Sequence, residues 1–298
     1  MKLLFTGASG FLGINTLKIL QNQYSTTTIG LNSNNNIQFD ISQGVPSIDS
    51  KFDIILHAAG KAHSIPKNEG EKKDFFDVNL QGTKNLCAAI EKSGTPKSFI
   101  FISTVAVYGV ESGENITEDF PLNGNTPYAL SKILAEQFLL EWCQKHNVIL
   151  SIIRPSLIAG PNPPGNLGAM VSGIKSGKYL SISSGNARKS VLMVQDIAIL
   201  LPLLANKGGV YNVCDSEHPT FRNLELVISE QLGKHLPPSI PLILAKCFAL
   251  IGDFLGNKAP INSNKLEKIT KSLTFSNKKA TIELGWTPLC VLKNFKIH

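Results

Sequence analysis

The sequence predicts an α/β fold, with a doubly wound parallel sheet in its first half and a smaller C-terminal α/β substrate-binding domain. Two observations carry this prediction. Short β-branched or aromatic runs alternate with longer stretches of helical periodicity, and a glycine-rich turn joins the first run to the first helix. The chain has 298 residues, of which 43% are hydrophobic and 17% charged, so it is long enough for a sizeable core and too apolar for intrinsic disorder.

The first half reads as an ordered series of strands and helices. The run Lys2 to Thr6 stops at Gly7, and apolar residues then recur at helical spacing up to Leu20. Later short runs predict strands at 27–31, 52–57, 98–103 and 149–153, and amphipathic patterns predict helices at 75–92 and 127–145. Right-handed crossovers between such strands give a parallel sheet with helices on both faces, and ligands then bind beyond the carboxyl ends of the strands.

The composition changes after Arg154, where glycine and proline crowd residues 160–168 and predict a long loop. We therefore place a domain boundary there, with residues 1–160 forming the sheet domain and 161–298 forming mainly the substrate domain, part of which can return to the sheet. A strand is predicted at 209–213 and helices at 221–232 and 241–255. The last helix is apolar enough to lie on a membrane surface, but two charged residues interrupt it, and we favour a buried or dimer-facing helix.

Charge and cysteine usage exclude several classes of protein. The net charge is +7, and residues 258–298 hold eight lysines against two glutamates. Because Lys265, Lys268 and Lys271 are spaced along a polar stretch, we expect a solvated face that at most attracts anionic substrates, with no nucleic-acid partner. The five cysteines are scattered without a CxxC pair, so we expect neither a zinc site nor disulfides, which suits a cytoplasmic location. The sequence contains no stretch of about 18 uncharged apolar residues, so we expect no membrane span.

The turn TGASGFLG, residues 6–13, carries the first functional prediction. It follows the first strand and opens the first helix, so the positive helix end faces the turn and a pyrophosphate belongs there. Gly7 would permit the tight turn, Gly10 the close approach of a phosphate and Gly13 the packing of helix on strand. The sequence therefore predicts a Rossmann-type dinucleotide site in residues 1–160.

The choice between NAD and NADP stays open at this stage. An acid at the end of the second strand binds the ribose hydroxyls of NAD, whereas NADP requires that acid to be absent. Asn32 occupies the position, and no arginine stands near it in the sequence. Asp40, a little further along, is a candidate acceptor for the adenine amino group.

Three residues predict the chemistry. Tyr128 and Lys132 lie four apart in a predicted helix and therefore share a face, about 6 Å apart. We expect the lysine to lower the pKa of the phenol, so that Tyr128 can exchange a proton with an alcohol or ketone. Thr104, at the end of the fourth strand, would hydrogen-bond the same substrate oxygen. The histidines, among them His57, His63 and His218, show no metal spacing, and we expect no metal site and no catalytic role for them.

With these pieces in order, the chain resembles the extended short-chain dehydrogenases/reductases of the NAD-dependent epimerase/dehydratase group, which act mainly on nucleotide sugars. The resemblance runs almost end to end. The motifs that carry it are TGASGFLG at 6–13, Asp40-Ile41, HAAG at 57–60, VNLQGT at 78–83, ISTVAVYG at 102–109, YALSK at 128–132 and RPSLIAGPN at 154–162.

The resemblance implies a set of site residues and partners. It implies Thr104, Tyr128 and Lys132 as the catalytic triad, and NAD or NADP as cofactor. Along the cofactor it implies Gly7, Gly10, Phe11, Leu12, Gly13, Asn32, Asp40, Ile41, Ala58, Ala59, Gly60, Asn79, Ser103, Tyr128, Lys132 and Pro155. Against a nucleotide-sugar substrate it implies Thr104, Asn166, Leu167 and one of Arg188 and Lys189, and it implies a homodimer.

Three functional alternatives remain at this stage. HAAGKAHSI at 57–65, GNL at 165–167 and NARKSVLMVQDIA at 186–198 look like reductases of UDP-4-keto-6-deoxy-N-acetylhexosamines, so a 4-keto-sugar reductase comes first. A nucleotide-sugar 4-epimerase uses the same triad and comes second. Val105-Ala106 stand where dehydratases carry an Asp-Glu pair, which disfavours elimination. A noncatalytic NAD(P) sensor or nucleic-acid-associated protein is a distant third reading, against which the intact Tyr128 and Lys132 argue.

Overall fold

A computed structural model describes residues 1–62, 64–255 and 261–298. Its centre is a seven-stranded sheet in the order β11-β7-β5-β4-β1-β2-β3, with every neighbouring pair parallel. This order, in which the chain moves outward in both directions from β1, confirms the doubly wound sheet. The strands are β1 (Lys2–Thr6), β2 (Ser25–Gly30), β3 (Ile37–Gln38), β4 (Ile54–His57), β5 (Ser98–Ile102), β7 (Ile149–Pro155) and β11 (Gly209–Val213).

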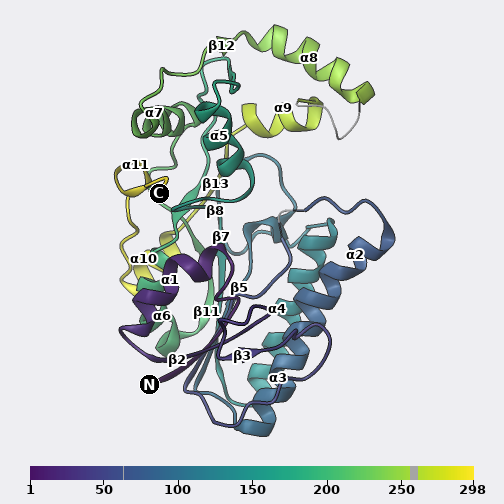
Figure 1. The fold of residues 1–298 in the computed structure, drawn as a ribbon, viewed down its shortest axis with the longest axis vertical. Helices are drawn as coiled ribbons and strands as arrows, with labels where there is room; N and C mark the ends of the chain where they lie inside the picture. The colour runs from purple at the N-terminus through teal and green to yellow at the C-terminus, as the bar shows by residue number, and fades with distance from the viewer. Residues whose placement is uncertain (63, 256–260) are drawn as a thin grey trace.

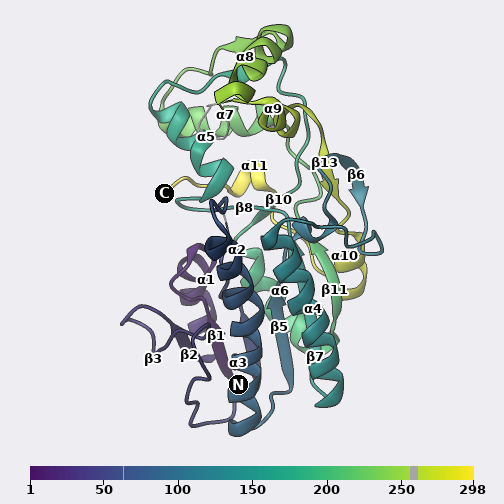
Figure 2. The same ribbon diagram turned by 90° about the vertical axis from the view of Figure 1, so that its right-hand side faces the viewer.

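Helices cover both faces of the sheet (Figures 1 and 2). One face packs against α1 (Phe11–Gln21), α6 (Asp196–Lys207) and α10 (Lys278–Leu284). The other packs against α3 (Gly82–Ser93) and α4 (Pro127–Lys145), and a π-helical segment, η1 (Asp77–Gln81), joins α3 to α2 (Glu69–Phe76). The predicted helix 75–92 therefore forms the later part of a longer helical run. The two apolar layers bury the strands from both sides, which explains their continuous runs of Leu, Ile and Phe.

The segment predicted as a long loop after Arg154 contains regular structure, so that expectation is wrong. Strand β8 (Leu157–Ala159) and helix α5 (Gly165–Lys175) lie there. The prolines do not interrupt this helix because they precede it, with Pro164 at its N-cap position. Further along, β11 returns to the sheet and pairs with β7 from Gly209↔Ser151 to Val213↔Pro155.

The remaining elements build an upper lobe and the seam beneath it. We define the upper lobe as residues 165–184, 221–255 and 261–271, which gather at the top of Figure 1. Besides α5 it holds β9 (Ser181–Ile182), α7 (Phe221–Leu232), β12 (Ser239–Ile240), α8 (Leu242–Leu255) and α9 (Ser263–Thr270). The seam contains β6 (Gly113–Ile116), β10 (Val191–Met193), β13 (Leu273–Phe275), α11 (Val291–Asn294) and the 3₁₀ helix η2 (Val105–Tyr108).

Helix α8 differs from its sequence-based prediction. Its large apolar side chains are exposed in the chain, and the exposed fraction reaches 94% at Phe254. The expectation of a helix buried within the chain is therefore wrong, because α8 packs against the rest of the lobe mainly through Ala245 and Ala249, with Leu242 partly buried beside them. Among the described residues, no helix is both long and apolar enough to cross a membrane.

Candidate active site

The glycine turn between β1 and α1 forms a cradle that side chains would fill. A Cβ atom on Gly7 would lie 2.6 Å from the Ala59 nitrogen, and one on Gly13 would lie 2.3 Å from the Ala8 carbonyl oxygen. Gly7 also has a φ of 81°, which favours glycine. Gly10 occupies the N-cap position of α1 without a side-chain hydrogen bond, so the first amides of α1 remain available to an anion. The donor set therefore fits the pyrophosphate of a dinucleotide.

The first residues of α1 contact both the apolar layer of the sheet and the end of β8. The Leu12 side chain packs against the apolar layer beneath the sheet. A Cβ atom on Gly160 would lie 3.4 Å from the Phe11 ring, so that ring sits where the chain leaves β8. Both residues predicted beside the cofactor thus adjoin the glycine cradle.

His57 at the end of β4 ties the cradle to the opposite helix layer. Its Nδ1 lies 2.6 Å from the Thr6 hydroxyl oxygen, and its Nε2 lies 2.9 Å from that of Thr83. Complete burial and the nearby Lys132 charge lower the pKa of His57 to about 3, so the ring is neutral at physiological pH. His57 is therefore a buried core residue whose two ring nitrogens are both used within the protein. His63 lies outside the described residues.

The HAAG segment passes beside an asparagine held in the π-helical turn η1. The Asn79 side chain accepts a hydrogen bond from the Lys61 amide at 2.8 Å and donates to the Ser131 hydroxyl at 2.9 Å. A Cβ atom on Gly60 would lie 2.9 Å from the Asn79 carbonyl oxygen and 3.5 Å from the Lys132 nitrogen. Through these two hydrogen bonds the Asn79 side chain joins the HAAG segment, predicted to lie along the cofactor, to helix α4.

Lys132 is almost wholly buried beneath this strip. Its ammonium donates to the Ile102 carbonyl at 2.8 Å and lies 4.4 Å from the centroid of the Phe101 ring. Burial lowers the pKa of Lys132 to about 8, and the Glu136 charge opposes that shift only in part. Burial thus destabilises the charged form of Lys132, whose ammonium lies close to Gly60 of the HAAG segment.

Tyr128 and Thr104 meet at the carboxyl end of β5. Thr104 is the N-cap of η2, where its hydroxyl accepts a hydrogen bond from the Ala106 amide at 3.1 Å. Burial raises the pKa of the Tyr128 phenol, and a side-chain hydrogen bond with Thr104 opposes this rise. The expectation that Lys132 lowers this pKa is wrong for this structure, because burial dominates and the lysine is not among the groups that shift it.

A buried ion pair beneath the triad was not recognised from the sequence. Arg154 on β7 donates to both carboxylate oxygens of Glu136 on α4, at 2.6 and 3.1 Å, and Glu136 also accepts from the Ser103 hydroxyl. Arg154 further contacts the Tyr108 hydroxyl at 3.1 Å. Ser103, predicted to lie along the cofactor, is engaged in this network. Arg154 stands in a quoted motif, but no local pattern pairs it with Glu136.

The residues predicted near the adenosine lie around the carboxyl ends of β2 and β3. Asn32 is exposed, and its backbone oxygen accepts hydrogen bonds from the Asn35 amide and side chain at 3.1 and 2.9 Å. Asp40 accepts from the amide and hydroxyl of Ser42. The Ile41 side chain is buried in the core beside α3, so only its backbone can face a cofactor.

A cavity of about 580 Å³ runs between the upper lobe and the seam, beginning at Val105 next to Thr104. Asn166 and Lys189 line it, whereas Leu167 is buried in the lobe core and Arg188 is exposed outside the lining. Burial lowers the pKa of Lys189 to about 8, although the nearby Glu111 charge opposes this. The structure thus separates the two basic candidates and places Lys189 in the cleft. Pro155 is the last residue of β7, paired with Val213 on β11.

The cleft contains groups that sequence reasoning did not assign. They are Glu111, Ser156, Tyr179, Phe221, Lys265 and Lys268. The Ser156 hydroxyl is buried, lines the cleft and has no hydrogen-bond partner among the described residues. Lys268 pairs with Glu111 at 3.2 Å. The predicted solvated face on α9 therefore turns in part toward the cleft, and no local signal marks which lysines do so.

One cluster of ligand-type residues lies apart from the cleft. Asp215, Glu217 and Cys290 bring one ligand atom each within 4.8 Å of one another. The Asp215 carboxylate is engaged in hydrogen bonds within the protein, since it accepts from the Val291 and Glu217 amides at 2.8 and 3.2 Å. These contacts explain the cluster as a structural tie between the chain after β11 and α11.

The geometry supports transfer of a proton and a hydride at one carbon. The Tyr128 phenol shares a hydrogen bond with the Thr104 hydroxyl, and the buried Lys132 ammonium lies one helical turn further along α4. The glycine cradle adjoins Ala58 and Ala59, and the basic cleft begins at Val105, next to Thr104. The phenol can donate a proton, the threonine can hold the same oxygen, and the cradle can hold the dinucleotide that exchanges a hydride when bound.

Comparisons with known proteins agree with this architecture. N-acetyl-α-D-glucosaminyl-diphospho-ditrans,octacis-undecaprenol 4-epimerase of Escherichia coli O157:H7 is 29% identical over 93% of this chain and 87% of its own length. UDP-glucose 4-epimerase of Vibrio cholerae is 26% identical over 96% of this chain and 90% of its own. The structure of the protein RMD of Pseudomonas aeruginosa, complexed with NADPH, matches with a TM-score of 0.73 at 21% identity, over 99% of this chain and 96% of that one.

The sequence profile of the NAD dependent epimerase/dehydratase family matches residues 3–214, from β1 to the residue after β11. This range spans the glycine cradle, the triad and the buried ion pair. Other similar proteins include a GDP-6-deoxy-D-mannose reductase, and several similar structures were solved with NAD, NADPH or UDP-glucose. The chain belongs to the NAD-dependent epimerase/dehydratase family of extended short-chain dehydrogenases/reductases.

Proposed function

We propose that the protein reduces a 4-keto group on a diphosphate-linked hexose, with Tyr128 as the proton donor. The hydrogen bond between Tyr128 and Thr104, with the buried Lys132 ammonium one helical turn further along α4, carries this proposal. Lys132 provides positive charge on the same side of α4 as Tyr128, and Thr104 aligns the sugar oxygen. Bound NAD(P)H supplies the hydride.

The cleft supports a diphosphate-linked substrate. Helix α5 begins at Gly165 without a side-chain cap, so its first amides form an anion-binding end. Lys189, Lys265 and Lys268 add positive charge along the same cavity. Both relatives named above act on sugars joined to a diphosphate, one carried by undecaprenol and one by uridine.

The reductase comes first because of where its motifs fall. Of the segments 165–167 and 186–198 that resemble keto-sugar reductases, Asn166, Lys189 and Ser190 line the cleft. The resemblance therefore includes positions that a substrate would contact. A 4-epimerase is the second candidate, favoured by the two relatives, which match over most of their lengths and are both named as 4-epimerases.

One experiment separates these two functions. The nucleotide released by denaturing freshly purified protein is identified by mass spectrometry, and the protein is then given NADH or NADPH with a UDP-4-keto-6-deoxy sugar. Stoichiometric loss of absorbance at the reduced nicotinamide band supports the reductase. Retained NAD, with interconversion of 4-epimers and no consumption of added cofactor, identifies the epimerase instead.

The proton-transfer assignment has its own test. Tyr128→Phe keeps the ring and its packing against Phe75, whose centroid lies 6.2 Å away, but removes the hydroxyl. We expect nucleotide binding to persist while kcat falls by about 10²-fold or more. Unchanged turnover would show that another group moves the proton.

A further inference from the structure

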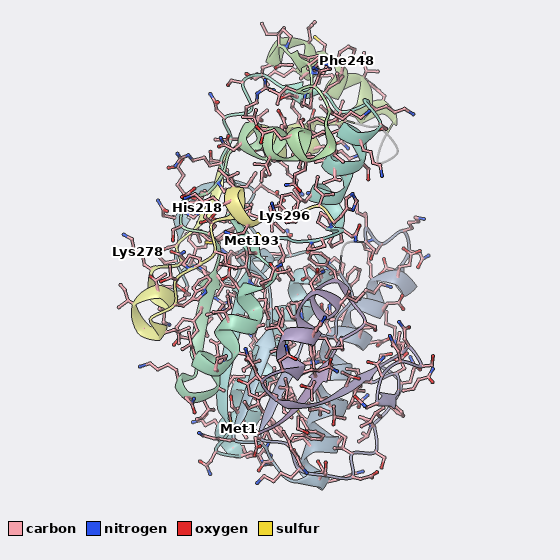
Figure 3. All side chains as sticks on the ribbon, turned by 60° about the vertical axis from the view of Figure 1, so that its left-hand side comes forward. Met1, Met193, His218, Phe248, Lys278 and Lys296 are labelled. Carbon is pink, nitrogen blue, oxygen red and sulfur yellow. The ribbon has the colours of Figure 1, made fainter. Side chains whose placement is uncertain are left out.

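Helix α8 presents a continuous apolar face at the outer end of the upper lobe. Its residues Ala245, Ala249 and Gly252 are buried, and they lie on one side of the helix at spacings of three and four. On the opposite side the exposed residues are Ile243, Leu244, Phe248, Leu250, Ile251 and Phe254. Figure 3 shows Phe248 at the tip of the lobe, at the opposite end of the molecule from Met1. A contiguous face of this kind indicates an interaction surface.

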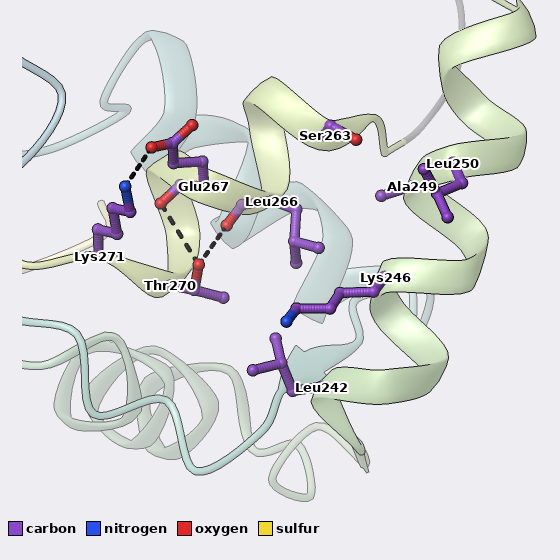
Figure 4. Close-up of a pocket in the computed structure, with 9 residues that line it drawn as sticks. All are labelled: Leu242, Lys246, Ala249, Leu250, Ser263, Leu266, Glu267, Thr270 and Lys271. Atoms are coloured by element: carbon purple, nitrogen blue, oxygen red, sulfur yellow. Dashed lines mark hydrogen bonds and ion pairs between the residues drawn. The ribbon is translucent and has the colours of Figure 1, made fainter.

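The charged residues of α8 do not interrupt this face. Asp253 accepts hydrogen bonds from the Ser263 amide and hydroxyl at 2.9 and 2.6 Å, which ties α8 to the start of α9. Lys246 lines a groove of about 590 Å³ between the two helices, where Figure 4 shows its ammonium directed into the space between them. Both charges therefore lie on the flank that faces α9. The outward side is left wholly apolar.

The charge of the upper lobe indicates which kind of partner binds the apolar face of α8. Segments 165–184, 221–255 and 261–271 contain eight Lys and Arg against four Asp and Glu, so they hold four of the chain's seven net positive charges. An apolar helix face on a lobe of net positive charge matches a bilayer with anionic lipid headgroups. A second copy docked through the same face would bring two positive lobes together, which like-charge repulsion opposes.

We propose that α8 docks the enzyme onto an anionic membrane surface, lying in the headgroup region with Phe248, Ile251 and Phe254 directed toward the acyl chains. A helix of 14 residues is about 21 Å long, well short of the roughly 30 Å hydrocarbon core, so it lies on the bilayer and does not span it. This surface goes beyond the proposed function, since it concerns where the enzyme works.

The position of α9 links this surface to the cleft. Lys265, Lys268 and Ile269 of α9 line the substrate cavity, whereas Leu266 and Thr270 line the groove against α8. A single short helix therefore separates the two. Docking through α8 places the substrate cavity of the enzyme one helix away from the lipid-facing side of the lobe.

Vesicle flotation tests the proposal with the full chain. Wild-type protein is mixed with vesicles of phosphatidylglycerol and phosphatidylethanolamine, or of phosphatidylcholine alone, and floated on a density gradient. We expect it to float with the anionic vesicles and to lose binding in high salt. The double variant Phe248→Ser, Phe254→Ser should reduce the bound fraction by about tenfold or more.

A matched control shows whether vesicle binding depends on the apolar face of α8 or on exposed apolar side chains in general. Ile282 on α10 is 79% exposed and lies outside the upper lobe, so Ile282→Ser should float like wild type. Because all three residues are exposed, the variants should keep the wild-type circular dichroism, melting temperature and nucleotide binding. These readouts do not require turnover, so they stand independently of the proposed reaction.

Either of two outcomes overturns the proposal. The first is a negative flotation result, in which the wild-type protein stays at the bottom of the gradient with anionic vesicles or the double variant floats as well as wild type. The second is that neither protein binds vesicles, while sedimentation equilibrium shows a stable wild-type dimer and a monomeric double variant. That result would assign the face to a second copy.

Discussion

Replacing Lys132 with methionine should make the fold more stable at neutral pH while it removes activity. The side chain is 4% exposed, and burial holds its pKa at about 8 instead of the usual 10.5. A shift of about 2.5 units corresponds to about 3 kcal/mol by which the charged lysine destabilises the folded state. Methionine has a similar length and carries no charge.

The stability gained by Lys132→Met is smaller than the destabilisation caused by the buried charge, because the ammonium also donates a hydrogen bond. Its partner is the Ile102 carbonyl at 2.8 Å, and leaving a buried acceptor unpaired costs about 1–2 kcal/mol. We therefore expect Lys132→Met to raise the free energy of unfolding by about 1–2 kcal/mol at pH 7. Glu136 keeps its ion pair with Arg154, so the variant does not strand a buried carboxylate.

The sign of the effect depends on pH. The folded pKa lies below the unfolded one, so the unfolded chain binds more protons between about pH 8 and 10.5. Wild-type stability therefore gains a contribution that is complete above about pH 10.5 and is lost as the pH falls through 8. The variant lacks this contribution, and its advantage at pH 7 should turn into a deficit of about 1 kcal/mol near pH 10.5.

Urea unfolding followed by tryptophan fluorescence at both pH values measures the two differences. Lys145→Met is a suitable control, because Lys145 lies exposed at the end of the same helix and its removal changes the net charge equally. A Lys132→Met protein that is less stable than wild type by the same amount at both pH values would refute the reasoning, since it would mean that the buried ammonium carries no net cost.

Three further substitutions have defined outcomes. Gly13→Ala places a methyl group 2.3 Å from a backbone oxygen of the cradle, and titration calorimetry should show nucleotide binding weakened by about tenfold or more. Glu136→Gln leaves Arg154 as a buried unpaired charge and should lower the free energy of unfolding by about 3 kcal/mol or more in urea titrations. Lys189→Met should raise KM for the diphosphate-linked substrate by about tenfold, whereas Arg188→Met, outside the cleft, should leave KM unchanged.

Two controls accompany these substitutions. Gly44→Ala adds the same methyl group where the nearest atom is 3.6 Å away, so nucleotide binding should not change. Glu141→Gln removes a carboxylate from an exposed position of α4 and should leave the unfolding free energy within about 0.5 kcal/mol of wild type. If either control matched its partner variant, the explanation from crowding or from the buried charge would fail.

The doubly wound parallel sheet and the glycine turn after its first strand could be predicted because their signals are local. Gly7 and Gly13 are required by a turn that a few neighbouring residues define, and the strands are short runs buried on both faces. Tyr128 and Lys132 share a helix, so their spacing alone places them near each other. Thr104 comes directly after the carboxyl end of β5, and the carboxyl ends of parallel strands are where ligands meet the sheet.

Other features could not be predicted because they depend on contacts between distant parts of the chain. The Arg154–Glu136 pair joins a strand to a helix, and neither residue carries a local mark of its partner. The raised pKa of Tyr128 reflects how deeply the folded chain buries it. Whether Lys268 faces solvent or the cleft depends on where α9 packs. The density of glycine and proline near α5 suggested a loop, although these residues position its first turn.

The return of β11 to the sheet has a consequence for dissecting the chain. β7 pairs with β5 on one side and with β11 on the other, and β11 comes from residues far beyond position 160. A fragment cut at 160 would lose β11 together with α6 and α10, which cover one face. It would then expose a long apolar edge strand, which is a template for aggregation. The nucleotide-binding half is therefore expected to require the C-terminal half of the chain in order to fold.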